Sequence, residues 1–409
     1  MKLDNELTEP TIIHWHGLDI SEDNDGHPRF AIEPGGSYVY TFEVDQRPGT
    51  YWYHPHPHQR TGPQVYMGLA GMFIVEDPED AARGLPTGEH DLPLVLQDRI
   101  VARDGRLIYE PNAMTGFLGD RILINGNTRA TIGVERGSYR LRMLNGSNAR
   151  IYRLAWSDDA PITVIATDGG LLSVAIDKPY VMLAPGERID VWVDFGRVAT
   201  DEVWLETRAF DPGMSGGMMM GRGGMMGRQS PPELPNGAEL RLCRFVISGT
   251  GPRLKRPAAL DPLRRASDDE VVNLHQPRRF DISMRMMSWQ LNGGPFEMTS
   301  VAPNEHVKLG TTEEWELANV SGMMSMAHPI HVHGSQFQVV ARSGGGGPDA
   351  DLIRNGLIDD GWKDTVLVLP GETVRIRKTF AKHPGLFLYH CHNLEHEDAG
   401  MMRNFRVEP

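Results

Sequence analysis

The sequence predicts an all-β protein built from three similar sandwich or barrel domains in tandem. Short runs that alternate apolar and polar residues, bounded by Pro, Gly, Asn and Asp, recur along the chain, as in residues 37–44 and 188–195. A Pro-Gly turn followed by an alternating run occurs three times, at Pro34-Gly35, Pro185-Gly186 and Pro370-Gly371. Three copies of one unit indicate three domains, and convincing helical periodicity is scarce.

A second repeat, an Asn-Gly turn that leads to an alternating run, relates the last two domains. It spans residues 124–147 in one copy and 291–321 in the other. We therefore expect domains two and three to share an opening arrangement of strands. Stretches rich in Pro, Gly and charge mark the linkers. The expected domains are residues 1–88, 89–250 and 270–409, with a linker at 251–269.

Composition narrows the class of function. The 409 residues carry a net charge of -13, which argues against a nucleic-acid partner because phosphate binding relies on a basic surface. The longest apolar runs are far shorter than a membrane span, and the first residues do not form an export signal. With only two cysteines, no disulfide framework is predicted. We expect Cys243, which lies in an alternating run, to be an ordinary buried thiol.

The counts of 16 His and 21 Met stand out, because imidazole suits copper and thioether sulfur selects Cu(I). The motifs His14-Trp15-His16-Gly17 and His54-Pro55-His56 each place two imidazoles two residues apart, on one face of a strand. One such pair alone is more often structural or at the surface. Two pairs within one predicted domain favour a site with several adjacent metal ions.

Two further motifs lie in the last predicted domain, His328-Pro329-Ile330-His331-Val332-His333 and His390-Cys391-His392, the latter followed by His396 and Met401. Alternation along a strand directs Cys391 to one side and its two flanking histidines to the other, so one segment can reach two metal sites. Two His, one Cys and a weak axial Met form the blue-copper electron-transfer set. Cys391, His396 and Met401 supply three of these ligands, and His328 is the expected fourth.

A structural zinc site is the alternative for Cys391 and the nearby histidines. Zinc would leave at least six clustered histidines without a function, whereas copper sites use all ten. The other six histidines are expected at the surface or beside the ligands, and they are His27, His58, His90, His275, His306 and His383.

In type, order and spacing, the four motifs resemble those of the multicopper oxidase family, and the resemblance covers nearly the whole chain. Residues 144–150, 168–170 and 361–365 look most like bacterial laccases and periplasmic cuprous oxidases. The resemblance implies three cupredoxin-like Greek-key domains and four copper ions, one of type 1, one of type 2 and a type 3 pair. The implied ligands are His328, Cys391, His396 and Met401 for type 1, His14 and His331 for type 2, and His16, His54, His56, His333, His390 and His392 for type 3.

The resemblance also implies a reaction, one-electron oxidation of a substrate coupled to four-electron reduction of O2 to water. Asp25 and Glu397 resemble acids that deliver protons, and Cys391 carries electrons. Phenols, aromatic amines, Cu(I) and other metal ions are the expected reducing substrates. The methionines favour Cu(I) oxidation in copper tolerance, and the candidate ligands of substrate copper are Met284, Met324 and Met326.

Three features depart from the family. Only 13 residues precede His14, so domain one is expected to be shortened at its N-terminal end. Position 324 holds Met where cuprous oxidases have an acid, and the Gly- and Met-rich segment 213–227, expected to be a loop, lies in domain two. A monomer in the periplasm or secreted is expected from the resemblance. The rival hypothesis is a non-catalytic copper-sequestering protein on the same scaffold, which the retained ligand set disfavours.

Overall fold

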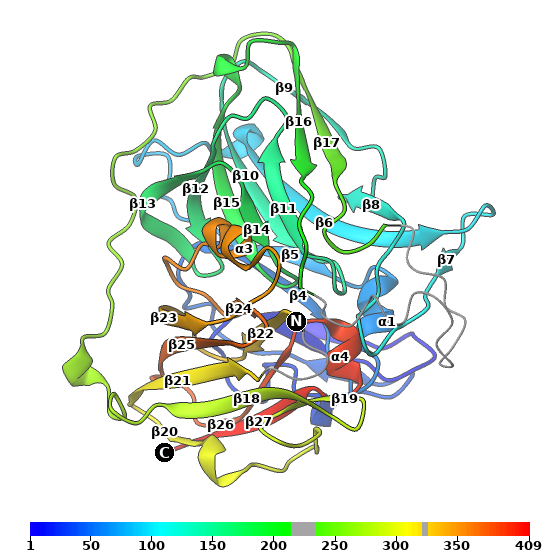
Figure 1. Cartoon of the computed structure of the whole chain (residues 1–409), viewed down its shortest axis with the longest axis vertical. Coiled ribbons are helices and arrows are strands. Elements are labelled where there is room, and N and C mark those ends of the chain that lie inside the picture. The colour runs from blue at the N-terminus through cyan, green and yellow to red at the C-terminus, as the bar shows by residue number, and fades with distance from the viewer. Residues whose placement is uncertain (214–233, 321–325) are drawn as a thin grey trace.

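The computed structural model describes residues 1–213, 234–320 and 326–409, and within them it is built mainly from β-strands. In those ranges six sheets form, and each takes its strands from one of three consecutive stretches of sequence. We name these stretches the N-terminal unit (β1–β5), the middle unit (β6–β17) and the C-terminal unit (β18–β27). Figure 1 shows the middle unit in cyan and green above the C-terminal unit in yellow to red, with blue N-terminal segments in the lower half. None of the helices in the described ranges is long and apolar enough to cross a membrane.

The N-terminal unit has a three-stranded and a two-stranded sheet. In the larger sheet β4 pairs with β2 and β5, and in the smaller one β1 pairs with β3. Its elements are β1 (Lys2–Asp4), β2 (Ile13–His16), β3 (Ser37–Val39), β4 (Gly49–Pro55), α1 (Thr61–Tyr66) and β5 (Gly71–Val75).

The prediction of a strand over residues 37–44 is correct only for its beginning. After Val39 the chain leaves the sheet, because Thr41 N donates to the Asn24 side chain (2.7 Å) and not to a neighbouring strand. The Tyr40 ring then enters the core of the unit beside Trp15. A side chain from a loop has replaced the strand partner that the alternating pattern predicts.

The middle unit contains two sheets that enclose the largest hydrophobic core. One sheet has the order β13-β12-β15-β10-β6-β7, with β8 on β6, and the other has the order β14-β11-β16-β17-β9. The strands are β6 (Asp91–Val101), β7 (Leu107–Ile108), β8 (Arg121–Ile124), β9 (Thr131–Val134), β10 (Ser138–Asn145), β11 (Tyr152–Trp156), β12 (Ile162–Thr167), β13 (Gly170–Lys178), β14 (Val181–Leu183), β15 (Arg188–Asp194), β16 (Glu202–Thr207) and β17 (Leu240–Ile247).

The C-terminal unit has two five-stranded sheets, β19-β18-β21-β25-β23 and β20-β27-β26-β22-β24. Strand β25 alternates buried and half-buried residues along its whole length, as expected for a strand with one face in the core. The elements are β18 (Arg278–Arg285), β19 (Ser288–Leu291), β20 (His306–Lys308), β21 (Thr312–Asn319), β22 (His328–Val332), β23 (Phe337–Gly344), α3 (Ala350–Gly356), β24 (Thr365–Val368), β25 (Glu372–Thr379), β26 (Gly385–Cys391), α4 (Leu394–Asp398) and β27 (Met402–Glu408).

The repeated turns recur in the structure. Gly35, Gly186 and Gly371 have φ of 78°, 85° and 69°, a region that favours glycine, and each precedes a strand. The second repeat also holds: β6 pairs antiparallel with β8 and parallel with β10, and β18 pairs in the same way with β19 and β21. The two larger units therefore open with the same arrangement of strands.

Two further predictions concern the middle unit. The alternating run 188–195 forms β15, which ends at Asp194. Cys243 lies fully buried in β17, and burial raises the pKa of its thiol to about 12, as expected for an ordinary core thiol. The predicted Met-rich loop lies outside the described residues, apart from Gly213.

Candidate metal centre

The four histidine motifs meet between the N-terminal and C-terminal units. The pairing of β2 with β4 sets His14 opposite His54. The pairing of β22 with β26 sets His331 opposite His390. His14 Nε2 lies 3.3 Å from His331 Nε2, across the boundary between the units. Two sheets that share no strand therefore present their imidazoles to one another.

All ten predicted ligand histidines are buried, with at most 1% of the surface of each exposed. Nine of them fall into groups of three residues whose donor atoms lie within 4.8 Å of one another. The tenth, His392, is in none of the groups found in the described ranges, but its ring centroid lies 5.1 Å from that of His16 and 5.4 Å from that of His54. The groups are His14, His331 and His333; His14, His16 and His54; His56, His333 and His390; His328, Cys391 and His396; and His16, His331 and Asp364.

Hydrogen bonds assign the ring nitrogen that each histidine turns toward its neighbours. His14 Nδ1 lies 2.5 Å from the carbonyl oxygen of Asp25, and His331 Nδ1 lies 2.8 Å from that of Asp364. A carbonyl accepts only, so both Nδ1 atoms carry the proton and both Nε2 atoms present lone pairs. These lone pairs face each other at 3.3 Å. Such an arrangement is repulsive by itself and is favourable around a cation.

A second pair of rings repeats this arrangement. His333 Nδ1 lies 2.7 Å from Asp25 Oδ2, and His390 Nδ1 lies 3.1 Å from the carbonyl oxygen of Cys391. Their Nε2 atoms are 3.2 Å apart, and His56 Nε2 lies 3.3 Å from His390 Nε2. The Nε2 atoms of three imidazoles therefore converge, and imidazole nitrogens are a donor type that suits copper.

His16 is oriented differently from the other rings. Its Nε2 donates to Asp364 Oδ1 (2.9 Å), so its Nδ1 faces His54 Nε2 at 3.4 Å. His54 Nδ1 donates to the carbonyl oxygen of Pro55 (2.9 Å), which leaves its Nε2 as an acceptor. The side chain of Asp364 thus selects the nitrogen that His16 can offer to a metal.

A separate group surrounds Cys391, the last residue of β26. Its Sγ lies 3.5 Å from His328 Nδ1 and 3.6 Å from His396 Nδ1, and it accepts a hydrogen bond from Asn393 N (3.4 Å). Met401 is fully buried in the same core cluster. One sulfur and two imidazoles with a nearby thioether have the composition of a blue-copper site.

Burial sets the protonation of these groups. It lowers the pKa of His54 to about 4 and that of His396 to about 3, so both rings are neutral and able to bind metal at neutral pH. Burial also raises the pKa of the Cys391 thiol, which therefore requires a cation to ionise. For Asp364, burial acts to raise the pKa, but Arg188 and His16 hold it well below its usual range.

The two predicted acids border one group of histidines. Asp25 contacts His333 as described, and Glu397 lies 3.1 Å from His390 Nδ1 and 3.5 Å from His56 Nε2. Burial raises the pKa of Asp25 well above its usual value. Burial acts in the same direction on Glu397, but His390 and His56 lower its pKa to about 2. The pKa values of the two acids are therefore shifted in opposite directions beside the same three rings, which leaves Glu397 ionised at neutral pH.

Sequence reasoning missed several residues that contact the predicted ligands, among them Asp364, Trp289 and Met114. Asp364 is one of 54 acidic residues, and its position relative to His16 follows only from the fold. The Trp289 ring lies 4.5 Å from that of His328, and its Nε1 donates to the carbonyl oxygen of Met114 (3.1 Å). That carbonyl lies 3.3 Å from His396 Nε2. A main-chain acceptor leaves no signal in the side-chain pattern.

The remaining predicted residues are placed as follows. Met326 belongs to the core cluster of Cys391, and Met284 packs against that cluster, whereas Met324 lies outside the described residues. Among the six other histidines, His27 is fully buried and bonded to Asn404 (2.9 Å).

The lowered pKa values predict how pH acts on the metal-free protein. A histidine in the unfolded chain has a pKa of about 6.5, so between about pH 6.5 and pH 4 the unfolded state binds more protons than the folded state. The free energy of unfolding therefore falls as pH falls through this window. We expect the Tm of the metal-free protein, followed by circular dichroism, to decrease steadily from pH 7 to pH 4.5.

Two variants test whether the pH dependence of the Tm comes from the buried histidines. His54→Gln removes one buried imidazole and should reduce the slope of Tm against pH, whereas His306→Gln, at a position that is 38% exposed, should leave it unchanged. A Tm that does not depend on pH, or equal slopes for both variants, would contradict the assignment of neutral buried rings.

Comparisons with known proteins show the family of this chain. Residues 1–80 and 271–409 match two family models, both described as multicopper oxidase. A multicopper oxidase from Staphylococcus aureus is 32% identical over all of this chain and 79% of its own length. A laccase from Bacillus subtilis is 31% identical over 98% of this chain and 80% of its own.

A solved structure gives the same result. The multicopper oxidase McoA from Aquifex aeolicus superposes with a TM-score of 0.84 and is 36% identical, covering 100% of this chain and 86% of that one. The β-units are thus cupredoxin-like domains, and the family implies copper of types 1, 2 and 3. The chain belongs to the multicopper oxidase family and is a copper-dependent oxidoreductase that uses O2 as electron acceptor.

Proposed function

We propose that this laccase-like oxidase binds its copper ions through the residues expected from the sequence. The lone pairs of neutral, buried imidazoles that converge between two units carry the proposal. Zinc at the Cys391 group would leave that larger cluster unexplained. The proposed ligands are His328, Cys391, His396 and Met401 for type 1, His14 and His331 for type 2, and His16, His54, His56, His333, His390 and His392 for type 3.

The proposal also covers the domain boundaries, the oligomeric state and the location of the protein. The N-terminal, middle and C-terminal units correspond to domains 1–88, 89–250 and 270–409, with a linker at 251–269. The separation of the sheets between these stretches supports the division. From the family resemblance we propose a monomer that acts in the periplasm or after secretion.

Bound copper supplies one-electron acceptance at the Cys391 group and reduction of O2 at the histidine cluster. The chain links the two groups covalently, because Cys391 is bonded to His390 on one side and His392 on the other. Both neighbours belong to the proposed type 3 ligands. Electrons therefore have a path of a few bonds that requires no mobile carrier.

Reduction of O2 to two waters consumes four protons, and the two acids are positioned to deliver them. Asp25 Oδ2 contacts His333 Nδ1, burial raises the pKa of Asp25 and so favours its protonated form, and its Oδ1 has no hydrogen-bond partner within the described ranges. Glu397 is ionised beside His390 and His56 and can accept a proton and pass it on at these rings. Two acids with oppositely shifted pKa values at one group of rings are suited to form a proton relay.

We propose that electrons enter at the type 1 group, on the side that Trp289 and Met114 cover. His328 and His396 are fully buried, so a substrate does not touch either ring directly. The buried Trp289 and the half-buried Met114 lie over them, so electrons from a donor docked at Met114 would pass through this layer. Phenols and aromatic amines are the proposed donors, and Met284 and Met326 on the same core favour Cu(I) as a further donor.

Cys391→Ser tests the type 1 assignment. Serine provides no thiolate, so we expect the intense blue absorption to disappear, oxygen uptake to fall to background and one copper per chain to be lost. The matched control is Cys243→Ser, which alters the other buried thiol and should retain colour and uptake. Oxygen uptake that survives in Cys391→Ser would contradict the assignment, and copper bound without any oxidase activity in the unaltered chain would favour sequestration.

Glu397→Gln tests the proton relay. Glutamine keeps the shape but cannot carry a proton, so steady-state oxygen uptake should fall about 100-fold. Reduction of the blue site by a phenol, followed by stopped flow without O2, should keep its rate. The control is Glu395→Gln, at a buried acid of the same helix that binds Tyr109 Oη (2.7 Å). Equal losses in the two variants would indicate a structural effect on α4 instead of proton delivery.

A further inference from the structure

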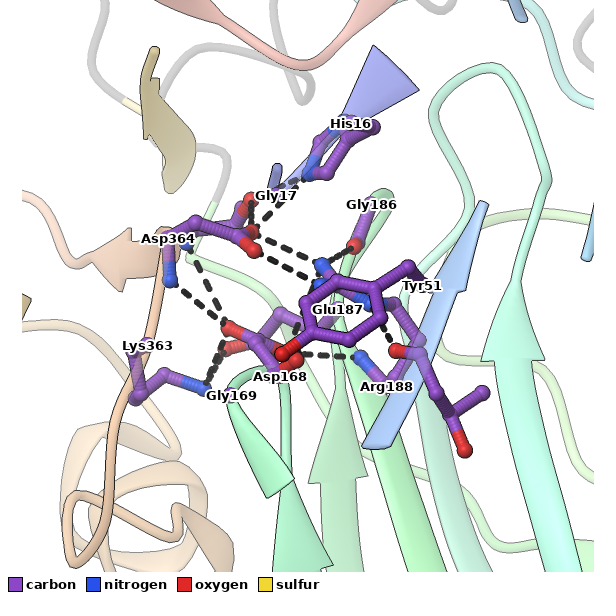
Figure 2. A network of polar contacts seen from close by, with 12 residues as sticks. His16, Gly17, Tyr51, Asp168, Gly169, Gly186, Glu187, Arg188, Lys363 and Asp364 are labelled. Atoms are coloured by element: carbon purple, nitrogen blue, oxygen red, sulfur yellow. Dashed lines mark hydrogen bonds and ion pairs between the residues drawn. The ribbon is translucent and has the colours of Figure 1, made fainter. Parts of the chain in front are cut away.

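The middle unit supplies none of the proposed copper ligands, yet one of its arginines reaches the cluster. Arg188 is the first residue of β15 and is fully buried. Figure 2 shows its guanidinium between Asp364 of the C-terminal unit and Asp168 of its own unit. Its Nη1 and Nη2 donate to the two carboxylate oxygens of Asp364 at 2.7 and 2.6 Å. This bidentate pair is the strongest geometry for an arginine and a carboxylate.

The other donors of Arg188 leave it no freedom to turn. Nε donates to the carbonyl oxygen of Thr50 (2.9 Å), Nη1 to that of Gly186 (3.0 Å) and Nη2 to that of Asp168 (3.0 Å). With the two bonds to Asp364, all five N–H groups have an acceptor. The acceptors come from all three units, so the guanidinium fixes the relative position of the units at this point.

Asp364 links the fixed guanidinium of Arg188 to the proposed ligand His16. The carboxylate oxygen that accepts from Arg188 Nη1 also accepts from His16 Nε2 (2.9 Å), as Figure 2 shows. Gly17 allows this approach, because a Cβ there would lie 2.6 Å from Asp364 Oδ2 and 2.8 Å from Arg188 Nη2. Arg188 therefore holds the carboxylate that turns His16 Nδ1 toward His54.

The same turn of the middle unit touches a second ligand. A Cβ at Gly186 would lie 2.9 Å from Cδ2 of His392, so the glycine backbone packs directly against that ring. Neither nitrogen of His392 has a hydrogen-bond partner in the described parts of the chain. Its ring is therefore placed by packing, and Gly186 is part of the surface that places it.

From these contacts we infer that the turn Gly186-Glu187-Arg188 is a positioning element for one type 3 copper. It orients His16 through Asp364 and His392 through direct contact, although the middle unit binds no metal. The inference rests on the proposed ligand assignment. It gives the middle unit a function in copper loading that is separate from substrate binding and from electron entry.

Arg188→Lys tests whether Arg188 orients His16 through Asp364. Lysine keeps the charge but cannot form the bidentate pair, so the carboxylate is released to rotate. We expect copper retention against a graded chelator to weaken about 10- to 100-fold for one copper per chain. The blue absorption should stay, because the Cys391 group has no contact with Arg188 in the described structure.

The control for this variant is Arg140→Lys. Arg140 is equally buried and bonds Asp190 through Nε (2.9 Å) and Nη2 (2.5 Å), and no described contact joins it to a ligand. Its loss should lower stability without changing copper retention. Full retention by a folded Arg188→Lys variant, or the same copper loss in Arg140→Lys, would overturn the inference.

Gly186→Ala tests the direct contact with His392, and Gly35→Ala is its control. The two glycines occupy the same position of the repeated Pro-Gly turn, with φ of 85° and 78°, so alanine is strained alike in both. Only at Gly186 would the new methyl group meet a ligand, whereas at Gly35 nothing lies within 4 Å. We expect copper loss in Gly186→Ala alone. Equal retention by both variants would overturn the inference that Gly186 helps to place His392.

A measurement on the unaltered chain covers the case in which these variants do not fold. Because coupling between two sites is reciprocal, copper added to the metal-free protein should slow amide hydrogen exchange at residues 186–188 but not at residues 35–37. Unchanged exchange at 186–188 would overturn the inference. Failure of the unaltered chain to bind copper at the histidine cluster would instead refute the proposed ligand assignment.

Discussion

Burial of eight imidazoles in one cluster, with the lone pairs of His14 and His331 directed at each other, is the constraint on which the rest of this structure depends. Each ring gives up its hydration, and a buried polar atom without a partner is costly. The Nε2 atoms of His14 and His331 approach to 3.3 Å with no proton between them. The fold must hold the rings rigidly for this arrangement to persist, and a cation bound among them would relieve the repulsion. The fold must therefore be strong where the units meet.

All three units help to hold the rings in position. The N-terminal and C-terminal units provide the rings from paired strands, where alternation places histidines two residues apart on one face. Main-chain carbonyls and the side chain of Asp364 fix the tautomers of His14, His331 and His16, so each of these rings presents one defined nitrogen. The middle unit adds Arg188, whose five hydrogen bonds join all three units. Ligand orientation and domain packing thus depend on the same contacts.

Much of this could be predicted from the sequence. The alternating runs and the Pro-Gly repeat predicted the β-units, because side-chain period and positive φ are local properties. The histidine spacing predicted that these rings would cluster. The sequence could not predict that Thr41 N would bond to Asn24 and end β3 early, nor that Asp364, Arg188 and the Met114 carbonyl lie at the site. Those contacts join residues far apart in the chain, and only the packed fold defines them.

The most direct test of this account is a copper titration of the metal-free chain, with bound copper, visible absorption and oxygen uptake measured on the same samples. The account predicts saturation at four coppers per chain, a blue band that appears with the Cys391 site, and uptake that begins only when the histidine cluster is filled. Saturation at one copper with a blue band, or copper bound without any blue band, would contradict it.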